Sequence, residues 1–207
     1  MTMSEYNRQQ IEAFMMVRHY LQGLSRSRIK QIKRRIMNYV RFRADVADFQ
    51  ALHFSEICTH KCFTSQTSAC CSREGIATFF ADVVINVLLS SEREIDAVLQ
   101  VLFTDLGGFK CVYLTGDGCV WRLKPIVCEM FLCRQAKENV FSTSEALRNR
   151  WEGLRRRERR YTWPSRPVLF DELETLFIRA GYDSPLMYLH KSPGLVRLKE
   201  RFLKSRP

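Results

Sequence analysis

Apolar residues recur at helical spacing along the first fifty positions of the chain. One stripe in residues 6–24 comprises Ile11, Phe14, Met15, Leu21 and Leu24. A second stripe, after Gly23, comprises Ile29, Ile32, Ile36 and Val40. Spacings of three and four residues are typical of an amphipathic helix, so this region predicts two helices.

The last third of the chain shows the same period. Leu147, Trp151 and Leu154 share one helical stripe, and Ser142 precedes Glu145 with the spacing of a capping box. Farther along, Asp171 is expected to cap a helix that runs to about residue 180, where Gly181 ends it. We therefore expect helices in this part too.

The middle of the chain mixes two patterns. The apolar run Ile76–Leu89 predicts a buried helix and is shorter than the roughly 20 residues of a membrane span. Asp82 and Asn86, four residues apart on it, face either a functional site or solvent. Alternation in 111–114 and 119–123 around a Thr-Gly-Asp-Gly turn predicts a hairpin. The expected fold is one α-rich domain with a small β-hairpin.

Charge divides the 207 residues into three parts. The net charge of +11 splits into +6 for residues 1–50, −2 for 51–140 and +7 for 141–207. We assign these ranges to basic N-terminal helices, a core, and a basic helical extension packed on it. The first ten residues lack the features of a secretory signal, which predicts a cytoplasmic protein without a membrane span.

All eight cysteines lie in the one segment that is not basic. They are Cys58, Cys62, Cys70, Cys71, Cys111, Cys119, Cys128 and Cys133. A reducing cytoplasm disfavours a disulfide framework, and burial in a core would explain one or two thiols but not eight within 76 residues. This clustering favours metal ligation, and we take all eight as candidate ligands.

The spacing of the first four cysteines suggests how they bind. Cys58 and Cys62 lie four residues apart, which places both sulfurs on one face if the segment is helical. The adjacent Cys70 and Cys71 diverge on any regular backbone, so they require a turn, a polynuclear cluster, or one thiol that supports the ligands without binding. Both precede the predicted buried helix, whose dipole lowers the pKa of nearby thiols.

The second four cysteines surround the predicted hairpin. Its turn brings Cys111 close to Cys119, and a helix begun by Pro125 returns Cys128 to the same place. Cys133 is five positions beyond Cys128, about 140° around such a helix, and is the least secure ligand by geometry. Thiols from both groups are thus expected to converge on one centre.

This segment resembles the CxxCxxCC family of YkgJ-like zinc- or iron-chelating proteins. The resemblance is carried by the vicinal ending of the first group and by Cys111, Tyr113, Leu114, Cys119, Trp121, Lys124, Pro125, Cys128 and Phe131 in the second. The first group has spacings of three and seven residues where the family usually has two and two, and Glu129 replaces the family's arginine. The resemblance implies a bound metal or an iron–sulfur centre.

Two functions remain open from the sequence. In the first, the chain holds an iron–sulfur cluster, slightly favoured over zinc, for redox chemistry, metal sensing or metal handling. In the second, the metal stabilises the fold of a basic module that binds nucleic acid. A solvated basic helix face is the more common explanation of such charge. No P-loop, dinucleotide-binding turn, zinc-protease helix or nucleophile elbow is present, so no catalytic residue is assigned.

Overall fold

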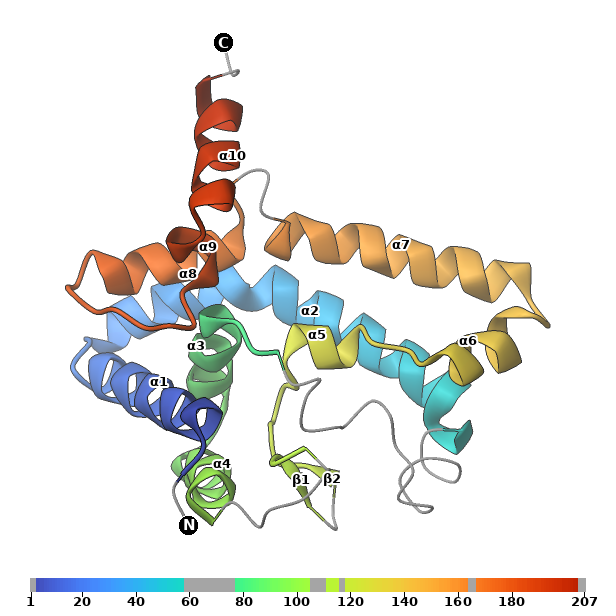
Figure 1. Ribbon diagram of the computed structural model, residues 1–207, viewed down its shortest axis with the longest axis horizontal. Helices are drawn as coiled ribbons and strands as arrows, with labels where there is room; N and C mark the ends of the chain where they lie inside the picture. The colour runs from blue at the N-terminus through green and yellow to red at the C-terminus, as the bar shows by residue number, and fades with distance from the viewer. Residues whose placement is uncertain (1–2, 58–76, 105–110, 116–117, 164–166, 205–207) are drawn as a thin grey trace.

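The computed structural model describes residues 3–57, 77–104, 111–115, 118–163 and 167–204. Its helices and strands, in chain order, are α1 (Glu5–Gln22), α2 (Arg26–Glu56), α3 (Phe80–Leu89), α4 (Glu92–Thr104), β1 (Leu114–Thr115), β2 (Gly118–Cys119), α5 (Ile126–Glu129), α6 (Arg134–Phe141), α7 (Glu145–Thr162), α8 (Leu169–Ile178), α9 (Tyr188–Lys191) and α10 (Pro193–Lys204). The prediction of a mainly helical chain with one small hairpin is confirmed, and the metal centre beside it stays a prediction (Figure 1).

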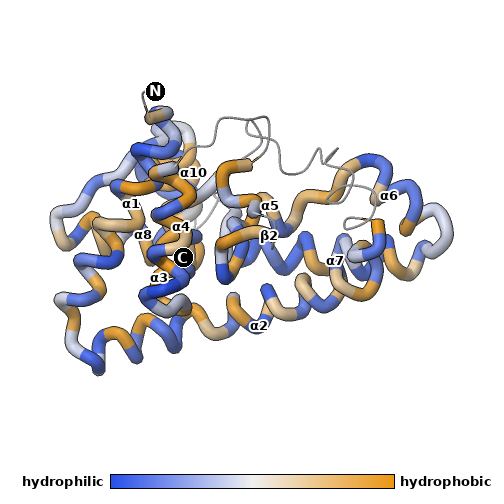
Figure 2. Tube along the Cα trace, turned by 90° about the horizontal axis from the view of Figure 1, so that it is seen from below, coloured by the Kyte–Doolittle hydropathy of each residue, from blue (hydrophilic) through white to orange (hydrophobic). Residues whose placement is uncertain are grey.

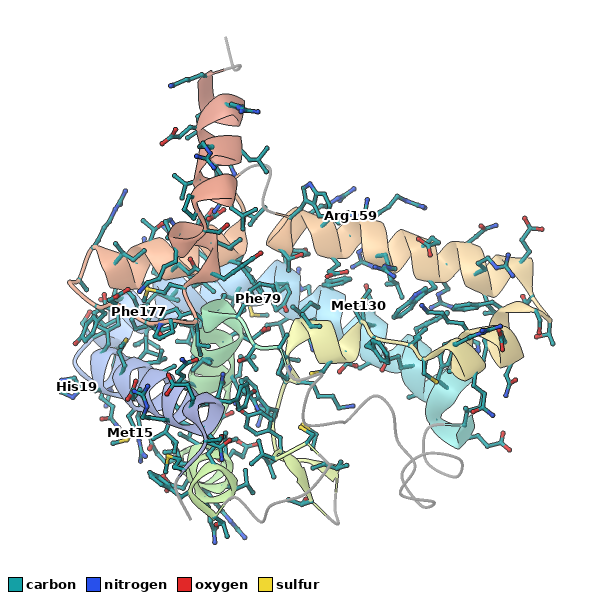
Figure 3. The ribbon with its side chains drawn as sticks, in the orientation of Figure 1. Met15, His19, Phe79, Met130, Arg159 and Phe177 are labelled. Carbon is teal, nitrogen blue, oxygen red and sulfur yellow. The ribbon has the colours of Figure 1, made fainter. Side chains whose placement is uncertain are left out.

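Helix α1 forms where the first stripe was predicted. The Ser4 hydroxyl accepts a hydrogen bond from the Asn7 backbone N–H and caps the helix. Phe14 and Val17 are fully buried, whereas Met15 is 54% exposed and lies on the outer side of α1 (Figure 3). The inward stripe therefore includes Val17 and excludes Met15, which we had placed on it.

Helix α2 is a rod of 31 residues, about 46 Å long, and it crosses the molecule from end to end (Figures 1 and 2). Its buried stripe continues well past the expected end at Val40, through Phe42, Val46 and Phe49 to Phe54. Helix α2 thus passes through residue 50, where the change in charge had suggested a boundary between segments. Helix α7 packs along it, and Phe49 stacks on Trp151 with ring centroids 5.8 Å apart.

Helix α3 is the buried helix of the core, as the apolar run predicted, although it begins at Phe80. It packs between α1 and α8. Phe79, at its N-terminus, contacts the rings of Phe170 and Tyr188 at 5.7 and 6.0 Å (Figure 3). Asp82 and Asn86 are both buried, so the alternative that they mark a solvent face is wrong.

Two predicted helix caps lie elsewhere in the structure. The hydroxyl that caps α7 belongs to Ser144, which accepts from the Leu147 backbone N–H at 3.3 Å, while Ser142 ends α6. Asp171 lies inside the first turn of α8, where its carboxylate accepts from the Val168 N–H at 3.2 Å. Ser142 and Asp171 each lie within three residues of the true helix start, so the periodic stripe located the helices better than the capping pattern did.

The small hairpin pairs Leu114 with Cys119 and Thr115 with Gly118 in antiparallel register. Gly118 has φ of +104°, a conformation that side-chain-bearing residues rarely adopt. In the described part of the chain, no helix is both long and apolar enough to cross a membrane.

Candidate metal centre

The structure describes four of the eight candidate cysteines. Cys58, Cys62, Cys70 and Cys71 lie outside the described residues. The other four are half-buried and follow one another through the hairpin, α5 and the start of α6. The geometry of the second group can therefore be compared with its prediction.

Two aromatic contacts fix the hairpin to the helices. The rings of Tyr113 and Trp121 meet edge to face at 5.3 Å, and Trp121 in turn meets Phe14 of α1 at 5.1 Å. All three rings are buried. Because Tyr113 and Trp121 alternate with Cys111 and Cys119 along the chain, anchoring the rings also fixes the position of both cysteines.

A chain of buried polar side chains runs from the hairpin into α1. The Tyr113 hydroxyl donates to Gln10 Oε1 at 3.2 Å, Gln10 Nε2 donates to Thr78 Oγ1 at 2.6 Å, and Tyr6 lies 3.4 Å from Tyr113 between hydroxyl oxygens. Burial raises the pKa of both tyrosines well above its usual value, so both phenols stay protonated. They are hydrogen-bond donors at neutral pH.

Three cysteines lie within electrostatic range of these phenols. After burial, which is the largest cause, Cys111 and Cys128 contribute to the raised pKa of Tyr6. Cys111 and Cys119 do the same for Tyr113. The hairpin register places Cys119 opposite Leu114, three residues after Cys111. The predicted return of Cys128 toward the hairpin is consistent with this arrangement.

Helix α3 holds the chain that leads to Cys128. Asn86 Oδ1 accepts from the Leu123 N–H, and Asp82 Oδ1 accepts from the Ile126 N–H, both at 3.1 Å. The other oxygen of Asp82 accepts from its own helix start at Phe79, also at 3.1 Å. Burial raises the pKa of Asp82 to about 6, although the positive charge of Arg43 lowers it. Both polar residues of the apolar helix therefore position the Cys128 segment.

Helix α2 holds the same segment from the other side. Arg43 is 1% exposed and donates to the Tyr39 hydroxyl at 2.8 Å and to the Lys124 carbonyl at 2.6 Å. It also forms an ion pair with buried Glu129, N to O 3.7 Å. Gln50 donates to the Glu129 carbonyl at the end of α5. Arg43 therefore belongs to the buried side of α2 and not to its solvated basic face.

Cys133 has a local role instead. Its sulfur accepts from the Ala136 backbone N–H at 3.4 Å and caps α6. The other three cysteines contribute to the pKa of a buried tyrosine, and Cys133 has no such effect on either phenol. Its place as the least secure of the ligands stays a prediction.

His53, Glu56 and His60 are further side chains of metal-binding type, all within five residues of Cys58 in the sequence. Glu56 is exposed at the end of α2, and His60 lies outside the described residues. His53 is half-buried against Phe49, with ring centroids 4.8 Å apart. Within the described ranges, no three side chains of His, Cys, Asp or Glu are placed to hold a metal ion together. The metal centre therefore stays a prediction from the sequence.

Sequence reasoning missed the polar side chains that support the site. Gln10 and Arg43 lie on the buried stripes of α1 and α2, and Gln50 is half-buried beside the stripe of α2. Their signal was a polar residue at a position where the helical period requires an apolar one. Burial of such a residue is favourable only when its hydrogen bonds are satisfied, so each of them predicts a distant polar partner.

Comparison of the chain with protein-family models, with curated proteins and with solved structures finds no match.

Proposed function

We propose that this protein binds an iron–sulfur cluster, or alternatively zinc, through cysteine thiolates. The observation that carries the proposal is the hairpin, which holds Cys111 and Cys119 beside the contact between Tyr113 and Tyr6; these two cysteines and Cys128 contribute to the raised pKa of one or both phenols. Thiolate sulfur is a ligand for both kinds of centre. Cys58, Cys62, Cys70 and Cys71 are proposed to supply the remaining ligands.

The surroundings of the three thiols suit such a centre. Tyr113 donates its hydroxyl hydrogen to Gln10 and Tyr6 donates to the Tyr113 hydroxyl, so both phenols are neutral and place no competing negative charge beside the thiols. The buried Nε1 of Trp121 has no hydrogen-bond partner among the described residues, which leaves a donor two positions from Cys119. Donors of this kind stabilise the negative charge that several thiolates carry around a metal.

The hydrogen bonds from α2 and α3 give the site its rigidity. Arg43, Asp82 and Asn86 bind backbone atoms between residues 123 and 126, directly before α5. Backbone fixed in this way holds Cys128 in place before any metal arrives, which lowers the conformational cost of binding. The function would be redox chemistry, metal sensing or metal handling.

The test is anaerobic purification followed by iron, sulfide and zinc analysis and a visible absorption spectrum. We expect iron with sulfide and a broad visible band, whereas zinc in a colourless protein would select the alternative. Protein free of both metals would overturn the proposal.

Single serine variants assign the ligands. Cys111→Ser, Cys119→Ser and Cys128→Ser are each expected to lose most of the bound metal. Cys133→Ser is the matched control, because we propose that its sulfur caps α6 and does not bind metal. Equal metal content in Cys128→Ser and Cys133→Ser would contradict this ligand assignment.

A further inference from the structure

Helices α2 and α7 form a continuous surface on one side of the molecule. The Tyr161 hydroxyl, near the end of α7, donates to the Asn38 carbonyl of α2 at 3.2 Å. One α7 turn earlier, Arg157 pairs with Asp45 at 2.7 Å, and its guanidinium lies 5.3 Å from the centre of the Phe42 ring. These contacts fix the C-terminal half of α7 against the middle of α2 (Figures 1 and 2).

Each helix carries a stretch with an excess of positive charge, and the two stretches approach one another at the contact of Tyr161 with Asn38. Residues 26–43 of α2 contain eight lysines and arginines and no acidic residue. Residues 148–160 of α7 contain seven arginines and two glutamates. These two stretches, far apart in sequence, therefore bring together most of the excess positive charge of the chain.

The contact of Tyr161 with Asn38 brings the backbone positions of particular cations on the two helices near one another. Arg34 and Arg41 lie about one turn before and after Asn38, and Arg160 precedes Tyr161. All three side chains are exposed, and none forms an ion pair within the described ranges. We call these three residues, with the exposed Lys30 and Arg156, the basic ridge.

The apolar faces of the two helices are not available to a membrane. Ile36, Tyr39 and Phe49 of α2 and Trp151 and Leu154 of α7 are all buried in the core. A helix that binds a lipid surface inserts its apolar face, whereas a nucleic-acid backbone requires only positive charge in a suitable arrangement. The ridge therefore favours a phosphodiester partner over an anionic membrane.

We propose that the basic ridge binds the sugar-phosphate backbone of nucleic acid without reading its sequence. The cations come from two packed helices, and contacts of arginine and lysine with phosphates carry no base information. This inference does not rest on the metal centre, because the ridge is built from α2 and α7 alone. The two proposals can fail separately.

The test measures binding of the full-length protein to a short fluorescent DNA duplex of mixed sequence, between about 50 and 200 mM salt. The ridge variant carries Arg34→Gln, Arg41→Gln and Arg160→Gln. Each phosphate contact contributes close to one unit to the slope of log affinity against log salt concentration. Loss of three contacts is therefore expected to make this slope less steep by about three.

The matched control carries Arg93→Gln, Lys137→Gln and Arg179→Gln, three exposed cations on α4, on α6 and directly after α8. It has the same net charge as the ridge variant and should keep nearly the wild-type slope. Circular dichroism and metal content, measured on both variants, show that fold and metal centre are intact.

Three results would overturn the proposal. One is no binding of the wild type at the lowest salt. Another is an equal loss of DNA affinity in both triple variants, which would indicate that binding depends on net charge and not on the ridge. The third is ridge-dependent binding to vesicles of phosphatidylcholine and phosphatidylserine that is tighter than binding to DNA, which would assign the surface to a membrane.

Discussion

The helical frame and the cysteine-bearing segment, residues 111–133, are held together in different ways. The frame packs rings and aliphatic side chains, as where Phe49 stacks on Trp151 and Phe80 meets Phe177 at 5.0 Å. The cysteine segment contains only four paired strand residues and the short α5, and buried polar side chains of the frame hold its backbone. The frame thus supplies stability, and its few buried polar groups position the candidate site.

The largest effect on the free energy of unfolding is expected from a substitution within the helical frame. Trp151→Ala removes a buried ring that stacks on Phe49 and should lower the free energy of unfolding by about 4 kcal/mol. Urea denaturation measures this loss. Metal content per folded chain should stay unchanged, because Trp151 does not contact the cysteine segment.

The matched control for this variant is Trp163→Ala, since Trp163 is 47% exposed. It should change stability by less than about 0.5 kcal/mol. Similar losses in the two tryptophan variants would contradict the assignment of stability to the buried frame.

A somewhat smaller effect is expected at the junction of frame and segment. Arg43→Ala removes the buried one of the two cations that pair with Glu129 among the described residues, leaving half-exposed Lys124 at 3.9 Å, and it leaves the Lys124 carbonyl without its donor. We expect a loss of about 3 kcal/mol in unfolding free energy together with reduced metal content. Unlike Trp151→Ala, this variant should affect both properties.

Arg41 provides the control for Arg43 because it lies two residues away and is exposed. Arg41→Ala should leave stability within about 0.5 kcal/mol of wild type and keep the metal. Normal metal content in folded Arg43→Ala would show that the hydrogen bond to residue 124 does not position the site.

The raised pKa of Asp82 predicts that stability depends on pH. Its pKa is about 6 in the folded protein and 3.8 as the ordinary value, so between these pH values the folded state binds more protons than the unfolded state. Stability should therefore fall as pH rises from about 4 to about 6, by about 3 kcal/mol in total from this group.

Asp82→Asn removes this titration while preserving the shape of the side chain. The difference in unfolding free energy, wild type minus variant, should decrease across that pH range and stay constant above it. Denaturation at a series of pH values measures it. A difference that does not change with pH would mean that burial does not raise the pKa of Asp82 in the folded protein.

The smallest effect on stability is expected at the N-terminal cap of α6. Cys133→Ala removes the acceptor for the Ala136 N–H and should cost about 0.5 kcal/mol, whereas Cys133→Ser supplies a better acceptor and should be at least as stable as wild type. Thermal unfolding distinguishes the two variants. If both lost metal, Cys133 would belong to the ligands after all.

The frame could be predicted from sequence because it depends on a local period. Ile32 and Ile36 are buried on α2, and Trp151 and Leu154 on α7, as their spacing indicated. The predicted apolar stripe of α2 extends only as far as Val40. In the structure its buried residues continue to Phe54.

The support of the candidate site could not be predicted in the same way. Asp82 was recognised as unusual on an apolar helix, but its partner at Ile126 is 44 residues away in the chain. Such pairs depend on the path of the folded chain, which periodicity does not reveal. The alternation around the turn did predict the hairpin that carries Cys119, whereas the convergence of Cys111, Cys119 and Cys128 on one centre stays a prediction.

The central claim is that sulfur atoms of this chain bind a metal, and X-ray absorption at the iron or zinc edge of anaerobically purified protein tests it most directly. We predict a shell of sulfur neighbours at about 2.3 Å from the metal, reduced in Cys128→Ser and unchanged in Cys133→Ser. A first shell made only of nitrogen and oxygen would contradict the claim.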